Sequence, residues 1–367
     1  MKWSGKKGVA KTIDSYIIEL KFSTKKHLLV EGNSDKALFE RLFTVLSPIY
    51  EKENNKKLND EIFIDDADFI ENNPGLEKEK LGNWEKIEVI CEKIQNEPIA
   101  KRFVGFVDRD FRGFNICDNL QDELDKHNIQ GRLIWSRGHS IENYFFDYLI
   151  LRDALSSLSP INWLEDVINN FEKVLESTIR LACAVSLAAR ETELLDKVKH
   201  TVHREIIDID IKNLNINLKT DDWENFLTTN QHISADQAAN FIHKYQSWHL
   251  ITQKANFSVI RWLCHGHIGM LTVLAVYLCC VEEIGKKEAK VVINRKDAGI
   301  YDEITIEKQI NAKKQKMASS KVKSLQQRIN EEHITHACSY WWTTNIITTN
   351  RLIYPLEILN LFDINLF

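Results

Sequence analysis

Short apolar runs alternate with amphipathic stretches over roughly the first 150 residues, and this pattern predicts strands that alternate with helices. Each apolar run is four to seven residues long, which is typical of buried strands. In the stretches between them, apolar residues recur every three or four positions, as on one face of a helix. The predicted strands are 27–31, 61–65, 102–108 and 132–135; the predicted helices are 34–46, with Ser34 as N-cap, 84–94, 121–127 and 140–151.

This order of elements predicts an α/β fold with a mostly parallel four-stranded sheet flanked by helices. In such sheets, ligands bind beyond the carboxyl ends of the strands. Glu31 and Asp108 each end a predicted strand. We therefore expect a functional site at that edge of the sheet.

The strand signal fades after about Leu151, and the rest of the chain predicts mainly helices. We expect a catalytic domain over residues 1–155. Residues 156–367 are expected to form a mainly helical domain for dimerisation, partner docking or substrate binding. The longest predicted helices here are 163–203, 236–245, 268–283 and 308–332.

Composition narrows the cellular setting. The apolar run 268–281 is too short to span a bilayer, and no apolar core follows the basic N-terminal residues, so neither a membrane span nor a secretory signal is expected. The seven cysteines include no Cys-x-x-Cys pair, which is typical of a reducing compartment. These features predict a cytoplasmic protein.

Charge is distributed unevenly along the chain. The net charge is −5, but the window 286–328 contains twelve Lys or Arg and five Asp or Glu, a local charge of +7. A basic segment beside an acidic remainder fits a phosphate-binding face, and Lys313, Lys314 and Lys316 are its densest part. A solvated, lysine-rich helix face is the alternative, and the window alone favours it.

Two acidic motifs carry the candidate chemistry. In the first, Leu28-Leu-Val-Glu31-Gly32-Asn-Ser-Asp35, a strand ends in Glu31, and Asp35 at the start of the next helix can point back towards it. In the second, Val107-Asp108-Arg109-Asp110, two aspartates follow a strand. Such carboxylates can converge on Mg²⁺, which keeps several waters and leaves positions open for phosphate oxygens. Either motif alone is common by chance, and their combination in an alternating pattern is more specific.

The segments LLVEGNSDKALFERLF and FVGFVDRDFRG resemble the two signature segments of the Toprim domain, which topoisomerases, bacterial primases and OLD-type nucleases share. A third segment, WSRGHSIENYFF, is similar to a Ser-Ile-Glu-Asn-Tyr motif within the OLD-like group. That family includes the Toprim effector of PARIS-type phage-defence systems, which works with an ABC-type ATPase. The resemblance covers roughly residues 10–155.

This resemblance implies a role for each acid of the motifs. Glu31 would be the acid/base or metal-linked glutamate, Asp108 and Asp110 would bind Mg²⁺, for which Mn²⁺ can substitute, and Asp35 would serve a second ion or its waters. Glu142 would complete the site, or it would serve only the first turn of a helix capped by Ser140, and both interpretations stay open. Arg109 and Arg112 would bind phosphate, or they would pair with the carboxylates.

Other clusters are weaker. Cys264, His265 and His267 suggest zinc, as do His333, His336 and Cys338, but neither group has a second pair at ligand spacing, so core or cap roles are favoured. The aromatic run 340–342 could stack on bases, although such residues more often belong to a core.

The pattern as a whole predicts a Mg²⁺-dependent endonuclease that cleaves RNA, such as tRNA, or DNA in anti-phage defence by abortive infection. The chain has no Gly-x-x-x-x-Gly-Lys-[Ser/Thr] phosphate loop, so an ABC-type ATPase subunit would supply control. A homodimer is also an open arrangement. The alternatives are a non-enzymatic Toprim docking module on an ATPase, or an enzyme related to primases or topoisomerases.

Overall fold

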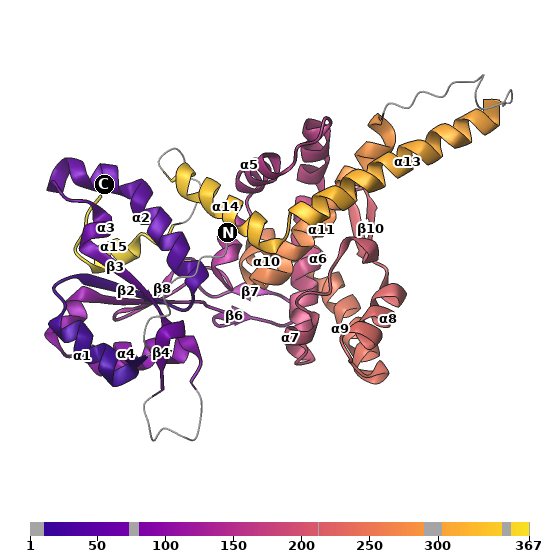
Figure 1. Cartoon of the computed structure of the whole chain (residues 1–367). Coiled ribbons are helices and arrows are strands. Elements are labelled where there is room, and N and C mark those ends of the chain that lie inside the picture. The colour runs from indigo at the N-terminus through magenta and orange to yellow at the C-terminus, as the bar shows by residue number, and fades with distance from the viewer. Residues whose placement is uncertain (1–10, 73–80, 212, 290–302, 347–353, 367) are drawn as a thin grey trace. The chain divides into compact units, whose positions relative to one another are not determined.

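The computed structural model describes residues 11–72, 81–211, 213–289, 303–346 and 354–366. By their contacts, they divide into two compact units, each with its own elements (Figure 1). Unit 1 comprises residues 1–113, 123–141 and 343–367, and unit 2 comprises residues 114–122 and 142–342. The predicted domains, 1–155 and 156–367, stay a prediction about which parts fold and function separately.

Unit 1 contains a mixed α/β arrangement around one five-stranded sheet of order β3-β2-β5-β9-β8. The four predicted strands are all present and mutually parallel, which confirms the α/β class: β2 (Lys26–Val30), β3 (Ile62–Asp66), β5 (Phe103–Val107) and β9 (Leu133–Trp135). The fifth strand, β8 (Asn128–Gln130), is antiparallel to β9 at the edge. That the whole arrangement is a Toprim fold remains a prediction.

Helices cover both faces of this sheet (Figure 1). On one face, α1 (Ile13–Phe22) and α4 (Asn83–Ile94) pack on the strands through a buried apolar cluster. On the other face lies α2 (Asn33–Asn54), whose Phe39 ring meets Phe106 of β5 edge-on at 5.0 Å between centroids.

Gly105 explains how closely α4 approaches β5. A Cβ atom added at Gly105 would lie 2.5 Å from the Ile87 side chain, so only glycine allows this contact.

The remaining elements of unit 1 are short. They are α3 (Leu58–Glu61), η1 (Ala67–Phe69), η2 (Pro98–Arg102), α15 (Glu357–Leu361) and the parallel pair β1 (Lys11–Thr12) and β4 (Ile70–Glu71).

The helix predicted at 121–127 is wrong. Residues Gln121–Asp122 form β7, which pairs with β6 (Phe114–Asn115) in unit 2, and β8 follows in unit 1. Gln130 of β8 pairs with Leu133, which leaves a two-residue hairpin loop containing Gly131 at φ +60°. Glycine is favoured at this position of a tight hairpin, and the resulting pairing outweighs the weak helical periodicity of a seven-residue stretch.

Two predicted helix starts also differ. Helix α2 begins at Asn33 with Gly32 as N-cap and not with Ser34, because the Asp35 carboxylate accepts the Gly32 N–H at 3.1 Å. The predicted helix 140–151 is a 3₁₀ turn, η3 (Ile141–Phe145), followed by α5 (Tyr148–Leu158), which Asp147 caps.

Unit 2 is mainly helical, as expected. Its long helices are α6 (Leu164–Glu191), α9 (Ala235–Lys254), α11 (Gly266–Glu288) and α13 (Glu303–Arg328). Shorter helices are α7 (Leu195–Val198), η4 (Arg204–Ile206), α8 (Thr220–Asn230), α10 (Phe257–Leu263) and α14 (Glu331–Asn345). The sequence-based prediction missed one hairpin, formed by β10 (Ile207–Asp210) and β11 (Asn215–Leu218).

Helix α11 corrects one expectation. Its 23 residues are long and apolar enough to cross a membrane, unlike the run 268–281 taken from the sequence. However, 83% of its most apolar window is buried within the chain. This burial is typical of the core helix of a soluble protein.

Candidate active site

The carboxyl ends of three neighbouring parallel strands place the acidic motifs at one edge of the sheet. Leu29 of β2 pairs with Gly105 of β5, and Val30 pairs with Asp66 of β3. This register brings the residue after β2, Glu31, level with the residues that end β3 and follow β5. The two sequence motifs, 77 positions apart, therefore meet in unit 1 as predicted from parallel pairing.

A hydrogen bond joins the two motifs directly. The backbone N–H of Asp108 donates to Glu31 Oε1 at 2.7 Å. Burial raises the pKa of the Glu31 carboxyl to about 7; the Asp108 N–H and the Arg112 charge oppose this shift, and the Asp110 charge adds to it. A carboxyl group with a pKa near neutrality can both accept and release a proton under physiological conditions.

Asp110 is held beside Glu31 in an uncommon backbone conformation. Its φ is +53°, in the left-handed region that side chains other than glycine, asparagine and aspartate seldom occupy. Its N–H donates to the His139 carbonyl at 2.8 Å, which fixes the turn. Burial raises the pKa of the Asp110 carboxyl, and Arg112, 4.0 Å away, lowers it. Such outliers cluster at functional sites.

Asp35 points back towards the β2 end, as predicted. Its carboxylate accepts the N–H of Gly32, next to Glu31, and so caps helix α2. A Cβ added at Gly32 would lie 4.0 Å from Asp35 Oδ2 and 3.9 Å from Asp68 Oδ2. Glycine here keeps two carboxylates close to the backbone, and a role for Asp35 at a second ion stays a prediction.

Sequence reasoning missed two further acids at the end of β3. Asp66 is 3% exposed, and neither of its carboxylate oxygens has a hydrogen-bond partner among the described residues, although Lys36 lies 3.6 Å away. Asp68 accepts from Asn83 Nδ2 at 2.7 Å, and the same amide donates to the Glu31 carbonyl at 2.9 Å. The available signal was the acidic run after the predicted strand 61–65.

Arg109 does not fit the predicted phosphate contact. Its side chain is 0% exposed, and its guanidinium donates to the backbone carbonyls of Arg112, Gly113 and Arg137. A guanidinium used in this way holds the loop after β5 in shape. The correction follows from burial, because a cation enclosed by carbonyl groups has little capacity left for a ligand.

Arg112 keeps the position predicted for a phosphate-binding cation. Its guanidinium lies 3.9 Å from the centroid of Trp84 and 5.1 Å from that of Trp135, and one of its nitrogens is 4.0 Å from Asp110 Oδ2. Its charge lowers the pKa of Glu31 and Asp110, in each case against the larger effect of burial.

Glu142 belongs to unit 2, so it is described there by itself. It is buried and lies in η3, a single 3₁₀ turn, so the predicted role in the first turn of a helix capped by Ser140 loses its basis. Its charge contributes to a raised pKa of His267, although the hydrogen bond between His267 Nδ1 and Glu331 contributes most. Unit 2 thus joins Glu142 to an imidazole and a second carboxylate.

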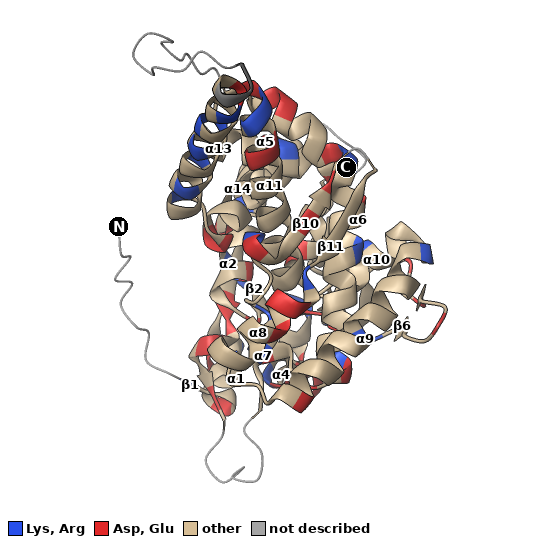
Figure 2. Ribbon diagram, turned by 90° about the vertical axis from the view of Figure 1, so that its right-hand side faces the viewer, with Lys and Arg blue, Asp and Glu red and all other residues tan. Residues whose placement is uncertain are grey.

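The three lysines predicted to bind nucleic acid lie on α13, where Lys and Arg recur along the helix (Figure 2). Lys313 and Lys316 are exposed, and Lys314 donates to the Lys287 carbonyl at 2.9 Å. No hydrogen bond or ion pair of the described residues uses the ammonium groups of Lys313 and Lys316. These groups remain available to a ligand or to solvent.

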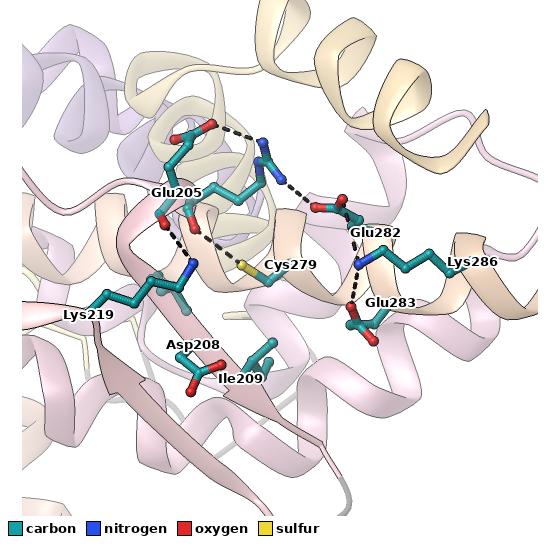
Figure 3. Close-up of a pocket in the computed structure, with 10 residues that line it drawn as sticks. Glu205, Asp208, Ile209, Lys219, Cys279, Glu282, Glu283 and Lys286 are labelled. Carbon is teal, nitrogen blue, oxygen red and sulfur yellow. Dashed lines mark hydrogen bonds and ion pairs between the residues drawn. The ribbon is translucent and has the colours of Figure 1, made fainter. Parts of the chain in front are cut away.

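Unit 2 also contains a polar pocket with a cavity of about 390 Å³, between η4, the β10–β11 hairpin and α11 (Figure 3). Most of its charges are already used in pairs: Arg204 bridges Glu205 and Glu282, and Lys286 contacts Glu282 and Glu283. Burial raises the pKa of Cys279 in its wall to about 12, so this thiol is no nucleophile at neutral pH. The pocket is better described as an ion-pair network than as a hydrolytic site.

The zinc alternatives receive no support. Within the described part of the chain, no group of three or more His, Cys, Asp or Glu side chains is arranged to hold a metal ion. Burial raises the pKa of Cys264 to about 12 and lowers that of His265 to about 4, as expected for core residues. Trp342 is fully buried, which supports the core interpretation of its aromatic run, although Tyr340 is exposed.

Comparison with known proteins gives no assignment: no protein-family model matches the chain, and no curated protein matches its sequence. The resemblance to Toprim nucleases therefore depends on the motifs in the sequence and on the local geometry of unit 1.

Proposed function

We propose that the chain is a metal-dependent endonuclease of the Toprim type. The observation that carries this proposal is the hydrogen bond from Asp108 N–H to Glu31, with Asp110 in the same turn. It joins two acidic motifs from distant parts of the sequence at the carboxyl edge of a parallel sheet. Burial there costs charged carboxylates energy, and proteins seldom retain such a cost without a ligand to offset it.

The donor set suits Mg²⁺, or Mn²⁺ in its place. Carboxylate oxygens are the ligands that these hard cations prefer, and Mg²⁺ needs only one or two of them together with waters. The buried charges of Glu31 and Asp110 repel each other and raise the pKa of Glu31, so the site lacks positive charge. Asp108 and Asp110 would hold the ion, with Asp35 and Asp68 near enough to the Glu31 backbone to orient its waters. The ion would supply an activated water and charge stabilisation on phosphate oxygens.

The chain's own residues would then divide the remaining work. Glu31, with a pKa near 7, accepts a proton from the attacking water or returns one to the leaving oxygen. Arg112 attracts the scissile phosphate, because a guanidinium pairs well with phosphate oxygens. Arg109 keeps the Asp108–Asp110 turn in place through its three carbonyl contacts.

The substrate class is nucleic acid, either RNA, such as tRNA, or DNA. The support is the basic face of α13 in an otherwise acidic chain, since phosphate backbones bind lysine arrays irrespective of sequence. A cytoplasmic protein that cuts nucleic acid needs restraint, and the chain has no phosphate loop of its own. We therefore include an ABC-type ATPase as the controlling partner in abortive anti-phage defence, in line with the family that the motifs resemble.

The test begins with the purified protein, Mn²⁺ or Mg²⁺, and end-labelled tRNA, single-stranded RNA and plasmid DNA. We expect metal-dependent cleavage of one class, abolished in Glu31→Gln and retained in Glu92→Gln, an exposed carboxylate on α4. The same assay is repeated on material co-purified with the adjacent ATPase, since free protein is expected to be weakly active. No cleavage by either preparation, with no growth defect on co-expression during phage infection, would leave only the docking-module alternative.

A further inference from the structure

Two tryptophans hold a charged side chain at the edge of the acidic site without fixing it by hydrogen bonds. The Arg112 guanidinium lies over the Trp84 ring at 3.9 Å and near the Trp135 ring at 5.1 Å. Among the described residues, its buried Nη1 has no hydrogen-bond partner, and its contact with Asp110 is a long 4.0 Å ion pair. An indole face attracts a guanidinium but does not fix its direction, so this side chain can turn while it stays attached.

The neighbouring Arg109 provides a contrast within the same loop. Three backbone carbonyls use its guanidinium at 2.6 to 3.0 Å, and the side chain is 0% exposed. Arg109 is therefore a fixed part of the loop. Arg112, three residues later, has a position set by stacking and by the charges of Asp110 and Glu31. A structural arginine would be expected to resemble Arg109.

We propose that Arg112 is an exchangeable counter-cation: it neutralises the acidic site until a divalent ion binds, and it then turns between Trp84 and Trp135 to bind a substrate phosphate. The proposal deepens the function above, because it names the anion-binding group of the same site. A divalent ion and a guanidinium compete for the same carboxylates, and each repels the other. Metal binding therefore releases the guanidinium at the moment when phosphate needs it.

This competition predicts a change of unusual sign. Removing a positive charge about 4 Å from a metal-binding carboxylate should tighten metal binding, whereas removing a merely structural residue should weaken it. In Arg112→Gln, we expect the affinity for Mn²⁺, measured by calorimetric titration, to rise about three- to tenfold. In Arg112→Lys, which keeps the charge but not the flat stacking group, the Mn²⁺ affinity should stay near that of the wild type.

A second measurement follows the two indoles. Mn²⁺ quenches fluorescence, so diamagnetic Mg²⁺ is used, and its titration should change the tryptophan emission of the wild type. The change should be smaller in Trp84→Phe and absent in Arg112→Gln. Arg102→Gln is the matched control, because Arg102 belongs to unit 1 but donates to the Ser23 carbonyl. It should bind metal and respond in fluorescence like the wild type.

Unchanged or weaker Mn²⁺ binding by folded Arg112→Gln would overturn the proposal, as would an emission change that persists in this variant. If Arg112→Gln does not fold, the wild type and Trp84→Phe still test it: equal emission changes in both overturn it. Failure of the endonuclease function would look different, since metal binding would tighten in Arg112→Gln while no preparation cuts nucleic acid.

Discussion

The two units treat buried charge in opposite ways. In unit 1, Glu31, Asp66 and Asp110 are carboxylates whose pKa burial raises, and their cationic neighbours only partly offset this. In unit 2, burial would also raise the pKa of Glu205, but the backbone and Arg204 leave it lowered. A hydrogen bond from Lys244 likewise lowers the pKa of Glu191.

This difference separates a site from a scaffold. Ion pairs that satisfy one another, as around the unit 2 pocket, need no further ligand. Carboxylates that stay under-compensated at the edge of a sheet gain from a cation, and so they indicate where a ligand binds. Unit 2 then contributes surfaces, among them the basic face of α13.

The largest expected effect tests whether unit 1 alone holds the chemistry. Glu31→Gln should lower cleavage by about 10²- to 10⁴-fold, the usual contribution of a positioned acid/base group. The measurement is the single-turnover rate with Mn²⁺ on the substrate class that the wild type cuts. Glu205→Gln, a paired carboxylate of unit 2, is the control and should retain the rate. Equally slow cleavage by both variants would remove the contrast between the units.

The next effect concerns pH and stability. Because the Glu31 pKa is about 7 in the folded chain and near 4.5 when unfolded, the folded state binds more protons between these values. Stability without a divalent ion should therefore fall as pH rises from about 4.5 to 7. Glu31→Gln should remove this dependence and gain on the order of 2 to 3 kcal/mol over the wild type at pH 8 relative to pH 4.5.

Urea unfolding in EDTA at several pH values measures this difference, with Glu92→Gln as the exposed control. A wild-type minus variant difference that does not change with pH would mean that Glu31 is ordinarily solvated, and the comparison between the units would lose its strongest case.

A smaller effect is expected for the metal ligands. Asp108→Asn and Asp110→Asn should each weaken Mn²⁺ binding by roughly tenfold, about 1.4 kcal/mol, in calorimetric titration. Asp110→Asn should also stabilise the metal-free protein slightly, because its charge raises the pKa of Glu31. Unchanged affinity in both variants would show that the ion binds elsewhere or not at all.

The smallest effect sharpens the role of unit 2. Neutralising Lys313, Lys314 and Lys316 together should reduce the salt dependence of nucleic-acid binding by about 0.7 to 0.9 in slope for each phosphate that is no longer neutralised. Fluorescence anisotropy at increasing salt measures it. The control neutralises three exposed lysines elsewhere in unit 2: Lys173, Lys197 and Lys254. Equal slopes for the wild type and the α13 variant would make this face a solvated or partner-docking surface.

The sequence by itself determined the alternation of strands and helices, the four parallel strands and the helical second part. Periodicity is local information, and the strands at 27–31 and 102–108 end in acids wherever they are placed in a sheet. From this, the convergence of Glu31 with Asp108 and Asp110 could be predicted, because parallel neighbours end at one edge. The helix predicted at 121–127 failed because a seven-residue stretch carries little periodicity, and pairing with β9 decided its structure.

Only the tertiary structure decided which of two similar residues does which work. Arg109 and Arg112 are three positions apart and equally basic, yet carbonyl groups enclose one and indole rings hold the other. Asp66 and Asp68 became part of the acidic edge only through the pairing of β3 with β2 and through Asn83 of α4. Burial and contacts between distant segments set the pKa of a carboxyl and the freedom of a guanidinium, and these quantities are not encoded in any short stretch of the chain.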